Sequence, residues 1–372
     1  MNHTGQEKAV NSLIAAEKAK KEGFFRKFIR FLTKLLLFII ETALLAALVL
    51  YAGMYVLAKG PSPAIRKIFV TSVRETSAIG FLADLYFTPE EIAEIEAVRE
   101  TEEFAPTDTS LFIESSPENT VSGDGVPVTD EWGLVDEDGD GIIIEPVKGS
   151  GYAGYMMIVL DPSRVIVGSV PSSFGGRGFR VSEFVERFDA VAGTNAGGFL
   201  DPNGEGNGST PDSTVVYEGE VYFSGFGCVD GIAAIDSDHI LHVARRMTEQ
   251  ELIDNDIQYA VCYGPVLISN GVPADPESLR VSLNPRTAIG QRADKAMLLL
   301  VIDGRQASSM GASFQDEIEI MQRYGAVNAI NLDGGSSSVM WFGGDYINKT
   351  ASVIGIRPVP TSILVLKEGA AG

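Results

Sequence analysis

The sequence predicts an α+β protein, in which a single globular domain with a mixed β-sheet flanked by helices follows an N-terminal transmembrane helix. Three observations predict this class. An apolar stretch near the N-terminus is long enough to span a bilayer. From Tyr155 onward, short apolar runs alternate with turn residues, which is typical of strands. Nearer the end of the chain, a strand, a helix and a strand follow one another, and this order indicates one βαβ unit.

The apolar stretch covers residues 35–58, and Glu41 is its only charged residue. It is longer than the apolar core of a signal peptide, so we expect an uncleaved transmembrane helix. Residues 1–34 carry eight Lys and Arg, whereas the basic cluster after the stretch is weaker. The positive-inside rule therefore predicts a single-pass cell-membrane protein with a basic cytoplasmic segment at 1–34 and the rest of the chain outside.

Acidic residues dominate the next part of the chain. The net charge is −21, and residues 84–147 hold 19 Asp and Glu against the single Arg99. Such a charge argues against nucleic acid as a partner. Residues 59–130 become rich in Pro, Ser, Thr and acids, so we expect an acidic extracytoplasmic spacer there. The folded domain is then expected at 131–372.

The sequence predicts no metal and no cofactor. Residues 136–141 fit the first half of a calcium loop, but Val147 stands where the loop requires a bidentate Glu, so an acidic turn is favoured. The chain has two cysteines, Cys228 and Cys262. A disulfide outside the cytoplasm and two buried thiols both remain open.

Two predicted strands end in polar residues and glycines. The strand at 190–192 leads to Asn195, Gly197 and Gly198. The strand at 326–332 leads to Asp333, Gly334, Gly335, Ser336 and Ser337. Glycine permits positive φ angles and close backbone approach, while the carboxylate and hydroxyls can turn toward a ligand. These strand ends indicate a binding site for a polyol or a phosphate.

Spacing predicts that further polar residues reach the same edge. Residues 286–291 and 296–302 form a hairpin that brings Arg286 and Thr287 beside Asp303. A helix starting at Ser313 then joins 296–302 to 326–332, and a βαβ crossover makes these strands parallel and close. Asp303 and Asp333 should therefore leave the sheet at one edge. Arg357 lies just before the closing strand, and with Arg286 it suggests an anion clamp.

The part of the chain from about residue 150 to 368 resembles the phosphodiester glycosidase family, whose bacterial members are often described as exopolysaccharide-related. The resemblance rests on several short motifs in the family's order: Asn195-Ala196-Gly197-Gly198-Phe199, Gly264-Pro265-Val266-Leu267, Pro285-Arg286-Thr287-Ala288-Ile289-Gly290, Val301-Ile302-Asp303-Gly304-Arg305, Asn331-Leu332-Asp333-Gly334-Gly335-Ser336-Ser337 and Arg357-Pro358-Val359. Two departures are Ala196, where the family pattern has Gly, and Ser336, where a third Gly often follows.

The resemblance implies a membrane-anchored enzyme that hydrolyses a sugar-1-phosphodiester, of the N-acetylglucosamine-1-phosphate type, in a surface or exported glycan. Asp333 is then the first candidate for the carboxylate at the anomeric carbon and Asp303 the second, with Arg286 and Arg357 on the phosphate. Substrate-binding roles are implied for Asn195, Gly197, Gly198, Thr287, Gly334, Gly335, Ser336 and Ser337. The alternative is a non-catalytic cell-envelope protein that binds or assembles polysaccharide.

Overall fold

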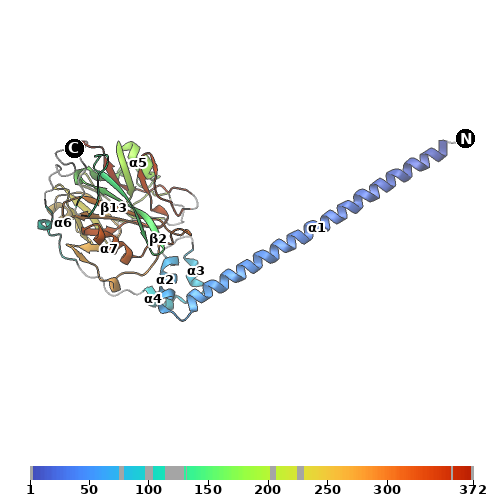
Figure 1. Ribbon diagram of the computed structural model, residues 1–372, viewed down its shortest axis with the longest axis horizontal. Helices are drawn as coiled ribbons and strands as arrows, with labels where there is room; N and C mark the ends of the chain where they lie inside the picture. Colours follow the sequence, from blue (N-terminus) through green and yellow to red (C-terminus); the bar gives the residue numbers. More distant parts are fainter. Residues whose placement is uncertain are drawn as a thin grey trace. The chain divides into compact units, whose positions relative to one another are not determined.

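The structure is a computed structural model that describes residues 3–74, 79–96, 104–113, 130, 132–201, 207–223, 230–352 and 355–369. The chain divides into two compact units, Met1–Arg66 and Lys67–Gly372 (Figure 1). Much of the predicted spacer, the centre of the glycine-rich loop at 202–206, and Cys228 lie outside the described residues. The predicted borders at 34/35, 58/59 and 130/131 stay predictions.

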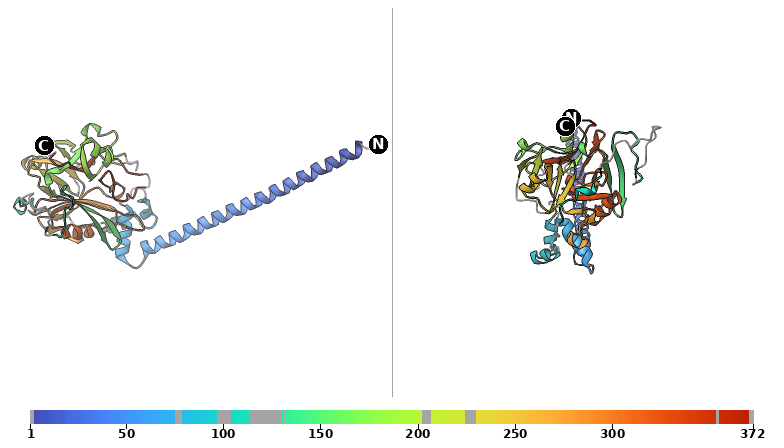
Figure 2. Two further views of the ribbon diagram at one scale, coloured as in Figure 1. Left: turned by 45° about the horizontal axis from the view of Figure 1, so that its top comes forward. Right: turned by 90° about the vertical axis from the view of Figure 1, so that its left-hand side faces the viewer.

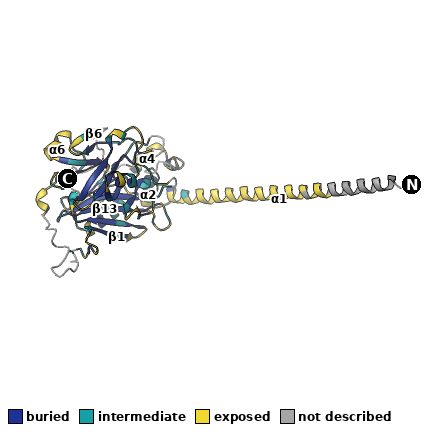
Figure 3. Ribbon diagram, turned by 90° about the horizontal axis from the view of Figure 1, so that it is seen from above, coloured by how far each residue is buried: buried dark blue, intermediate teal, exposed yellow. Residues whose placement is uncertain are grey.

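The first unit consists mainly of one long helix, α1 (His3–Lys59). Its part from Phe25 to Lys59 has a mean hydropathy of 2.5 and is long and apolar enough to cross a membrane. The side chains described in this part are almost all exposed, as the yellow ribbon in Figure 3 shows. An exposed apolar helix of this length is compatible with the predicted membrane anchor.

Three antiparallel sheets form the core of the second unit, and their strands can be followed in both views of Figure 2. The seven-stranded sheet has the order β1 (Ile142–Gly149), β2 (Tyr152–Val159), β13 (Met297–Ile302), β12 (Arg286–Arg292), β14 (Ala326–Asn331), β10 (Val266–Ser269) and β11 (Val272–Pro273). A five-stranded sheet has the order β16 (Asp345–Tyr346), β15 (Met340–Phe342), β4 (Ala190–Asn195), β17 (Thr361–Leu366) and β3 (Val165–Ser169). The other has the order β6 (Glu220–Phe223), β5 (Val215–Tyr217), β9 (Ile257–Cys262), β7 (Ile232–Asp236) and β8 (Leu241–Ala244).

Short helices connect and cover these sheets. The α-helices are α2 (Pro63–Arg74), α3 (Phe81–Asp84), α4 (Pro89–Glu96), α5 (Val181–Arg187), α6 (Glu249–Asp254) and α7 (Phe314–Arg323). The 3-10 turns are η1 (Thr109–Leu111), η3 (Pro162–Arg164), η4 (Pro171–Ser173), η5 (Pro276–Ser278) and η6 (Gly335–Ser337). Ser313 caps α7, because its hydroxyl accepts from Asp316 N and the Asp316 carboxylate accepts from Ser313 N at 2.8 Å.

The seven-stranded sheet is buried on both faces. Along β13, Leu298, Leu300 and Ile302 pack with α7 on one face. The intervening Met297, Leu299 and Val301 pack against the two five-stranded sheets on the other. Because successive side chains on a strand point to opposite faces, a strand covered on both sides reads as one unbroken apolar run. β13 is accordingly dark blue in Figure 3.

The predicted α+β class is confirmed, and so is a strand–helix–strand connection through β13, α7 and β14. β13 and β14 run in the same direction, but β12 lies between them and pairs antiparallel with both. All hydrogen-bonded strand pairs among the described residues are antiparallel, in place of the expected mixture. The reason is that β12, which precedes β13 in the chain and forms a hairpin with it, lies between the two strands that α7 connects.

Within the second unit, several residues before 131 pack against the sheet-rich part of the chain. Thr71 Oγ1 donates to the carbonyl oxygen of Val281, and Ile113 N donates to the carbonyl oxygen of Ala293 at 2.7 Å. Asp130 accepts from Arg292 Nη1 at 2.8 Å. The Arg292 side chain is 1% exposed and its guanidinium lies 3.8 Å from the centre of the Trp132 ring. These contacts attach the segment before 131 to the seven-stranded sheet.

Candidate functional site

The ends of β4 and β14 are joined by a buried amide. Asn195 Nδ2 donates to the carbonyl oxygen of Asp333, and Asp333 N donates to the carbonyl oxygen of Ala196 at 2.9 Å. Asn195 Oδ1 accepts from Thr287 Oγ1 at 2.9 Å and from Val339 N at 3.1 Å. Asn195 is fully buried and its amide is used in these contacts. Asn195 and Thr287 therefore hold the site loops together, which is a positioning role.

Asp333 lies at the centre of this junction. Its Oδ2 atom is buried and has no hydrogen-bond partner among the described residues. Burial raises the pKa of Asp333 from 3.8 to about 7, whereas the Ser337 hydroxyl and the nearby Arg357 charge act to lower it. A carboxyl group with this pKa holds or releases a proton near neutral pH. Such groups are suited to acid–base chemistry.

Arg357 supplies the positive charge beside Asp333. Its Nη1 donates to Ser336 Oγ at 2.8 Å, and its Nη2 forms an ion pair with Asp201. Its Nε is buried and has no hydrogen-bond partner in the part of the chain that the structure describes. The guanidinium carbon lies 5.2 Å from the centre of the Phe199 ring. Arg357 is therefore a candidate for binding an anion next to Asp333.

Glycines shape the loop after Asp333. Gly335 has a φ of +63°, in the left-handed region that side chains disfavour, and it opens the turn η6. Gly334 passes so close to the main chain that a Cβ there would lie 2.8 Å from the carbonyl oxygen of Pro285. The guanidinium of the exposed Arg305 lies over Gly335, with Nη2 3.3 Å from where a Cβ would be. The sequence did not single out Arg305 as a site residue.

Only the main chain of Arg286 lies at the predicted edge of the sheet, and its side chain points elsewhere. It pairs with Ile302 in the β12–β13 hairpin, and paired residues point to the same face, which here is the face that α7 covers. The Arg286 guanidinium is buried 4.0 Å from the centre of the Phe314 ring. Arg286 Nη2 donates to Ser282 Oγ at 2.8 Å, and Nε lies 3.9 Å from Glu317 Oε2. The structure therefore places the Arg286 side chain in the packing of α7.

Asp303 is also held by protein groups. Its Oδ1 accepts from Lys349 N at 2.9 Å and from Asn348 Nδ2 at 3.1 Å. Burial raises its pKa, and these hydrogen bonds act against that rise. Asn348 Nδ2 also donates to the carbonyl oxygen of Ser338. Asp303 therefore stabilises the loop that follows η6 through these hydrogen bonds.

The predicted glycines at the end of β4 adjoin a carboxylate that the sequence did not indicate. Gly197 N donates to Thr361 Oγ1 at 3.1 Å. Gly198 lies under Asp212, so that a Cβ on Gly198 would meet the Asp212 carboxylate and come within 2.9 Å of the Tyr263 ring. Burial raises the pKa of Asp212, and its charge in turn raises the pKa of Asp333. A single sequence holds no signal for this pairing, because Asp212 lies 121 positions from Asp333 in an ordinary turn segment.

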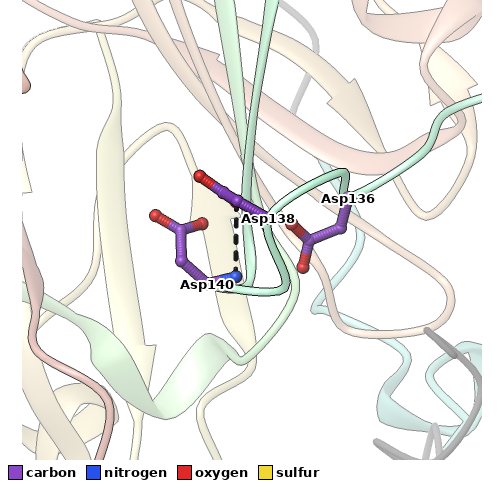
Figure 4. Close-up of side chains that lie close together, drawn as sticks. All are labelled: Asp136, Asp138 and Asp140. Carbon is purple, nitrogen blue, oxygen red and sulfur yellow. Dashed lines mark hydrogen bonds between the residues drawn. The ribbon is translucent and has the colours of Figure 1, made fainter. Parts of the chain in front are cut away.

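The only group of acids with metal-like spacing among the described residues is Asp136, Asp138 and Asp140 (Figure 4). Their ligand atoms lie within 4.8 Å of one another. The two carboxylate oxygens of Asp136 accept from Gly139 N at 3.0 Å and Gly141 N at 2.9 Å. The carboxylates of this group therefore close an acidic turn before β1.

The fold and the site define an α+β domain in which a buried carboxyl group and an arginine meet at the ends of two strands. Residues 188–366 match the family model for phosphodiester glycosidases. The matched residues make up just under half of the chain and lie within the Lys67–Gly372 unit.

Individual relatives are distant. The SPbeta prophage-derived uncharacterized protein YomE of Bacillus subtilis is 28% identical over 179 residues, which cover 47% of this chain and 28% of that protein. The N-acetylglucosamine-1-phosphodiester alpha-N-acetylglucosaminidase of Mus musculus is 25% identical over 219 residues, which cover 53% of this chain and 41% of that protein. The matched regions span less than half of either relative.

A solved structure shares the fold. The catalytic domain of the zebrafish N-acetylglucosamine-1-phosphodiester alpha-N-acetylglucosaminidase, auto-inhibited by its pro-peptide, superposes with a TM-score of 0.50 at 18% identity. The match covers 61% of this chain and 82% of the zebrafish chain. At this identity the similarity concerns the fold alone.

Proposed function

We propose that this protein is a membrane-anchored, extracytoplasmic glycosidase that hydrolyses a sugar-1-phosphodiester in a surface or exported glycan. The single observation that carries the proposal is the buried carboxyl group of Asp333, with a pKa of about 7, beside Arg357 in a domain that matches the phosphodiester glycosidase family model. The mouse relative is named for N-acetylglucosamine-1-phosphodiester, so we propose a substrate of that type.

The reaction breaks the bond between the anomeric carbon and the bridging phosphate oxygen. The departing phosphate monoester has a second pKa of about 6, so it leaves more readily than an alkoxide. The site then has to stabilise the phosphate charge and to provide a carboxyl group at the bond that breaks. We assign phosphate binding to Arg357 and Ser336, and the reacting carboxyl group to Asp333.

The other predicted residues have supporting roles in this proposal. Asn195 and Thr287 fix the position of Asp333 through the contacts described above. Gly334 and Gly335 allow the substrate to approach the main chain, and Ser337 hydrogen-bonds Asp333. Asp303 stabilises the site loops through its hydrogen bonds with Asn348 and Lys349. Arg286 does so through its hydrogen bond to Ser282.

The test is turnover of a panel of sugar-1-phosphodiesters by the purified full chain in detergent. We expect free sugar to be released from at least one member, and binding without release would instead support the non-catalytic polysaccharide-binding alternative. Arg357→Lys keeps the charge but loses the two-pronged donor geometry, so KM should rise by roughly tenfold or more. The matched control is Arg246→Lys, because Arg246 is exposed and lies outside the site. A normal KM in folded Arg357→Lys would remove Arg357 from phosphate binding.

A further inference from the structure

Asp212 and Asp333 are anchored to the same three-residue segment. Asp333 N donates to the carbonyl oxygen of Ala196 at 2.9 Å, and Asp212 N donates to that of Gly198 at 3.2 Å. Residues two apart in the chain have Cα atoms separated by about 7 Å at most. The main chains of the two acids are therefore fixed close together by the segment that follows β4.

The Asp212 side chain is directed along this segment. Its carboxylate lies against Gly198, where Cγ would be only 2.9 Å from a Cβ. The side chain is half-buried, and its own hydrogen bonds are to the adjacent Ser213 and to its own backbone. No ion pair neutralises Asp212 among the residues that the structure describes. A half-buried carboxylate without a neighbouring cation lowers the stability of the fold. Asp212 is therefore a candidate for a functional role.

The charges around Asp333 set how the two acids share protons. Arg357 and Asp212 both act on Asp333, Asp201 pairs with Arg357, and Arg305 lies over the neighbouring Gly335. Two nearby carboxyl groups in a half-buried site do not readily ionise together, so one keeps its proton to higher pH. The Oδ2 atom of Asp333 is buried without a hydrogen-bond partner among the described residues, and burial raises the pKa of Asp333 to about 7. It is the member that keeps the proton.

We propose that Asp212 is the second reacting carboxylate, which takes a proton from the water that attacks the anomeric carbon. The inference rests on the proposed function. The water oxygen forms a bond to the anomeric carbon, and one water proton moves to the Asp212 carboxylate. The bond from that carbon to the bridging oxygen breaks, and its electron pair stays with the phosphate. Asp333 gives its proton to that oxygen, and proton exchange with solvent then restores both acids.

The geometry around Gly198 fits this division of roles. Asp333 lies on the side of Ser337 and Arg357, where the phosphate would bind. Asp212 lies over Gly198 with the Tyr263 ring, which is 38% exposed and offers an apolar face to a sugar ring. The general rule for glycoside hydrolysis is that two carboxyl groups about 5–10 Å apart flank the scissile bond. The hydrogen bonds to Ala196 and Gly198 hold the two acids on one short segment, as such a pair requires.

The first test is kinetic and compares full-length Asp212→Asn with wild type. We expect kcat to fall by about 10²–10⁴ with KM nearly unchanged, because the loss of a base affects the transition state more than binding. The rate of wild type should rise with pH as Asp212 ionises and fall as Asp333 ionises, and Asp212→Asn should lose the rising limb. Gly198→Ala retains both charges but displaces the Asp212 carboxylate, so kcat should fall here too.

Asp254→Asn is the matched control, because Asp254 is an exposed acid on α6 whose side chain accepts from Gln250 of the same helix. It should leave kcat and the pH profile as in wild type. If wild type turns over a substrate while folded Asp212→Asn keeps normal kcat and both limbs, Asp212 is not the base, although the proposed function stands.

A second test needs no turnover. The carboxyl titration of Asp333 can be followed by ¹³C NMR and assigned by its loss in Asp333→Asn. Removing the like charge at Asp212 should lower the pKa of Asp333 below about 7. An unchanged titration in Asp212→Asn would overturn the carboxylate pair whether or not a substrate is known. A lowered pKa together with no hydrolysis of any substrate would support the pair and reject the hydrolysis on which the base role depends.

Discussion

At the scale of single residues, Asp333 has surroundings that favour its protonated form, and this couples stability to pH. Its pKa rises from 3.8 to about 7 on folding. Between these values the native state holds a proton that the unfolded state has lost, so stability falls as pH rises, and the loss is complete above the folded pKa. Asp333→Asn removes this penalty. We expect its Tm to exceed that of wild type by a few degrees at about pH 8.5 and by less at about pH 4.

Differential scanning calorimetry at both pH values measures this difference. Asp189→Asn is the control, because Asp189 is largely exposed and pairs with the half-exposed Lys367. If Asp333→Asn instead lowers Tm equally at both pH values, the carboxylate stabilises its loop and the raised pKa is wrong. A more stable but inactive variant would show that the site keeps a destabilising group for chemistry.

Sequence reasoning predicted several residues that the structure brings together, but it did not predict the directions of their side chains. Asn195, Asp333 and Arg357 follow from the rule that polar residues and glycines at strand ends face ligands. Arg286 lies at the right place in the chain, yet side-chain alternation along β12 turns it to the α7 face and turns Thr287 toward Asn195. Which face a strand presents depends on what packs there, and β12 is buried on both sides. Asp212 could be identified as a site residue only from its tertiary contacts.

At the scale of elements, the sequence identified β13, α7 and β14 because apolar runs and a capping box are local signals. It did not reveal that β12 lies between the two parallel strands, since strand order depends on pairings between distant segments. Nor did composition show which residues of the acidic spacer pack onto the domain. Asp130 illustrates this. In the sequence it is one acid among several in a polar stretch, and only the structure shows its ion pair with the buried Arg292.

Asp130 therefore matters for where the domain begins. Its carboxylate accepts from Arg292 Nη1 and from the main-chain N of Trp132 and Leu134. Asp130→Ala leaves a buried guanidinium with Asp294 as its remaining carboxylate. We expect the free energy of unfolding to fall by roughly 1–3 kcal/mol in urea titrations. A chain that starts at Glu131 should lose at least this amount relative to one that starts at Lys67, because it also lacks the contacts of Thr71 and Ile113.

Glu137→Ala is the control for this prediction, because Glu137 is an exposed acid in the same part of the chain. Equal stabilities of Asp130→Ala and Glu137→Ala would show that the Arg292 contact contributes little. They would also favour the predicted domain start at 131.

At the scale of the whole molecule, the predicted topology and the cysteine chemistry point to the same compartment. Cys262 is disulfide-bonded, and the chain has one other cysteine, Cys228, which lies outside the described residues. Disulfides persist in oxidising compartments. The basic segment before α1 predicts a cytoplasmic N-terminus. Protease added to intact cells should therefore remove the folded domain. Because Cys262 is buried, its thiol is tested in the denatured protein, where maleimide should label it only after reduction.

A cytoplasmic marker protein that stays intact in the same cells controls for leakage. Full protection of the domain from protease would reverse the predicted orientation. Labelling of Cys262 without reductant would show that its thiol is free. The topology would then be decided by the protease result alone.

The strand order of the sheet that holds Asn195 has a consequence for the timing of biosynthesis. β17 is the last described strand to be made, yet it lies between β4 and β3 and pairs with both. Until Thr361–Leu366 has emerged from the ribosome, β4 lacks its neighbour and the end that carries Asn195 cannot take its final place. A nascent chain halted before this strand should therefore be inactive in the proposed reaction. The proposed activity would begin only after β17 has been delivered and has paired with β4 and β3.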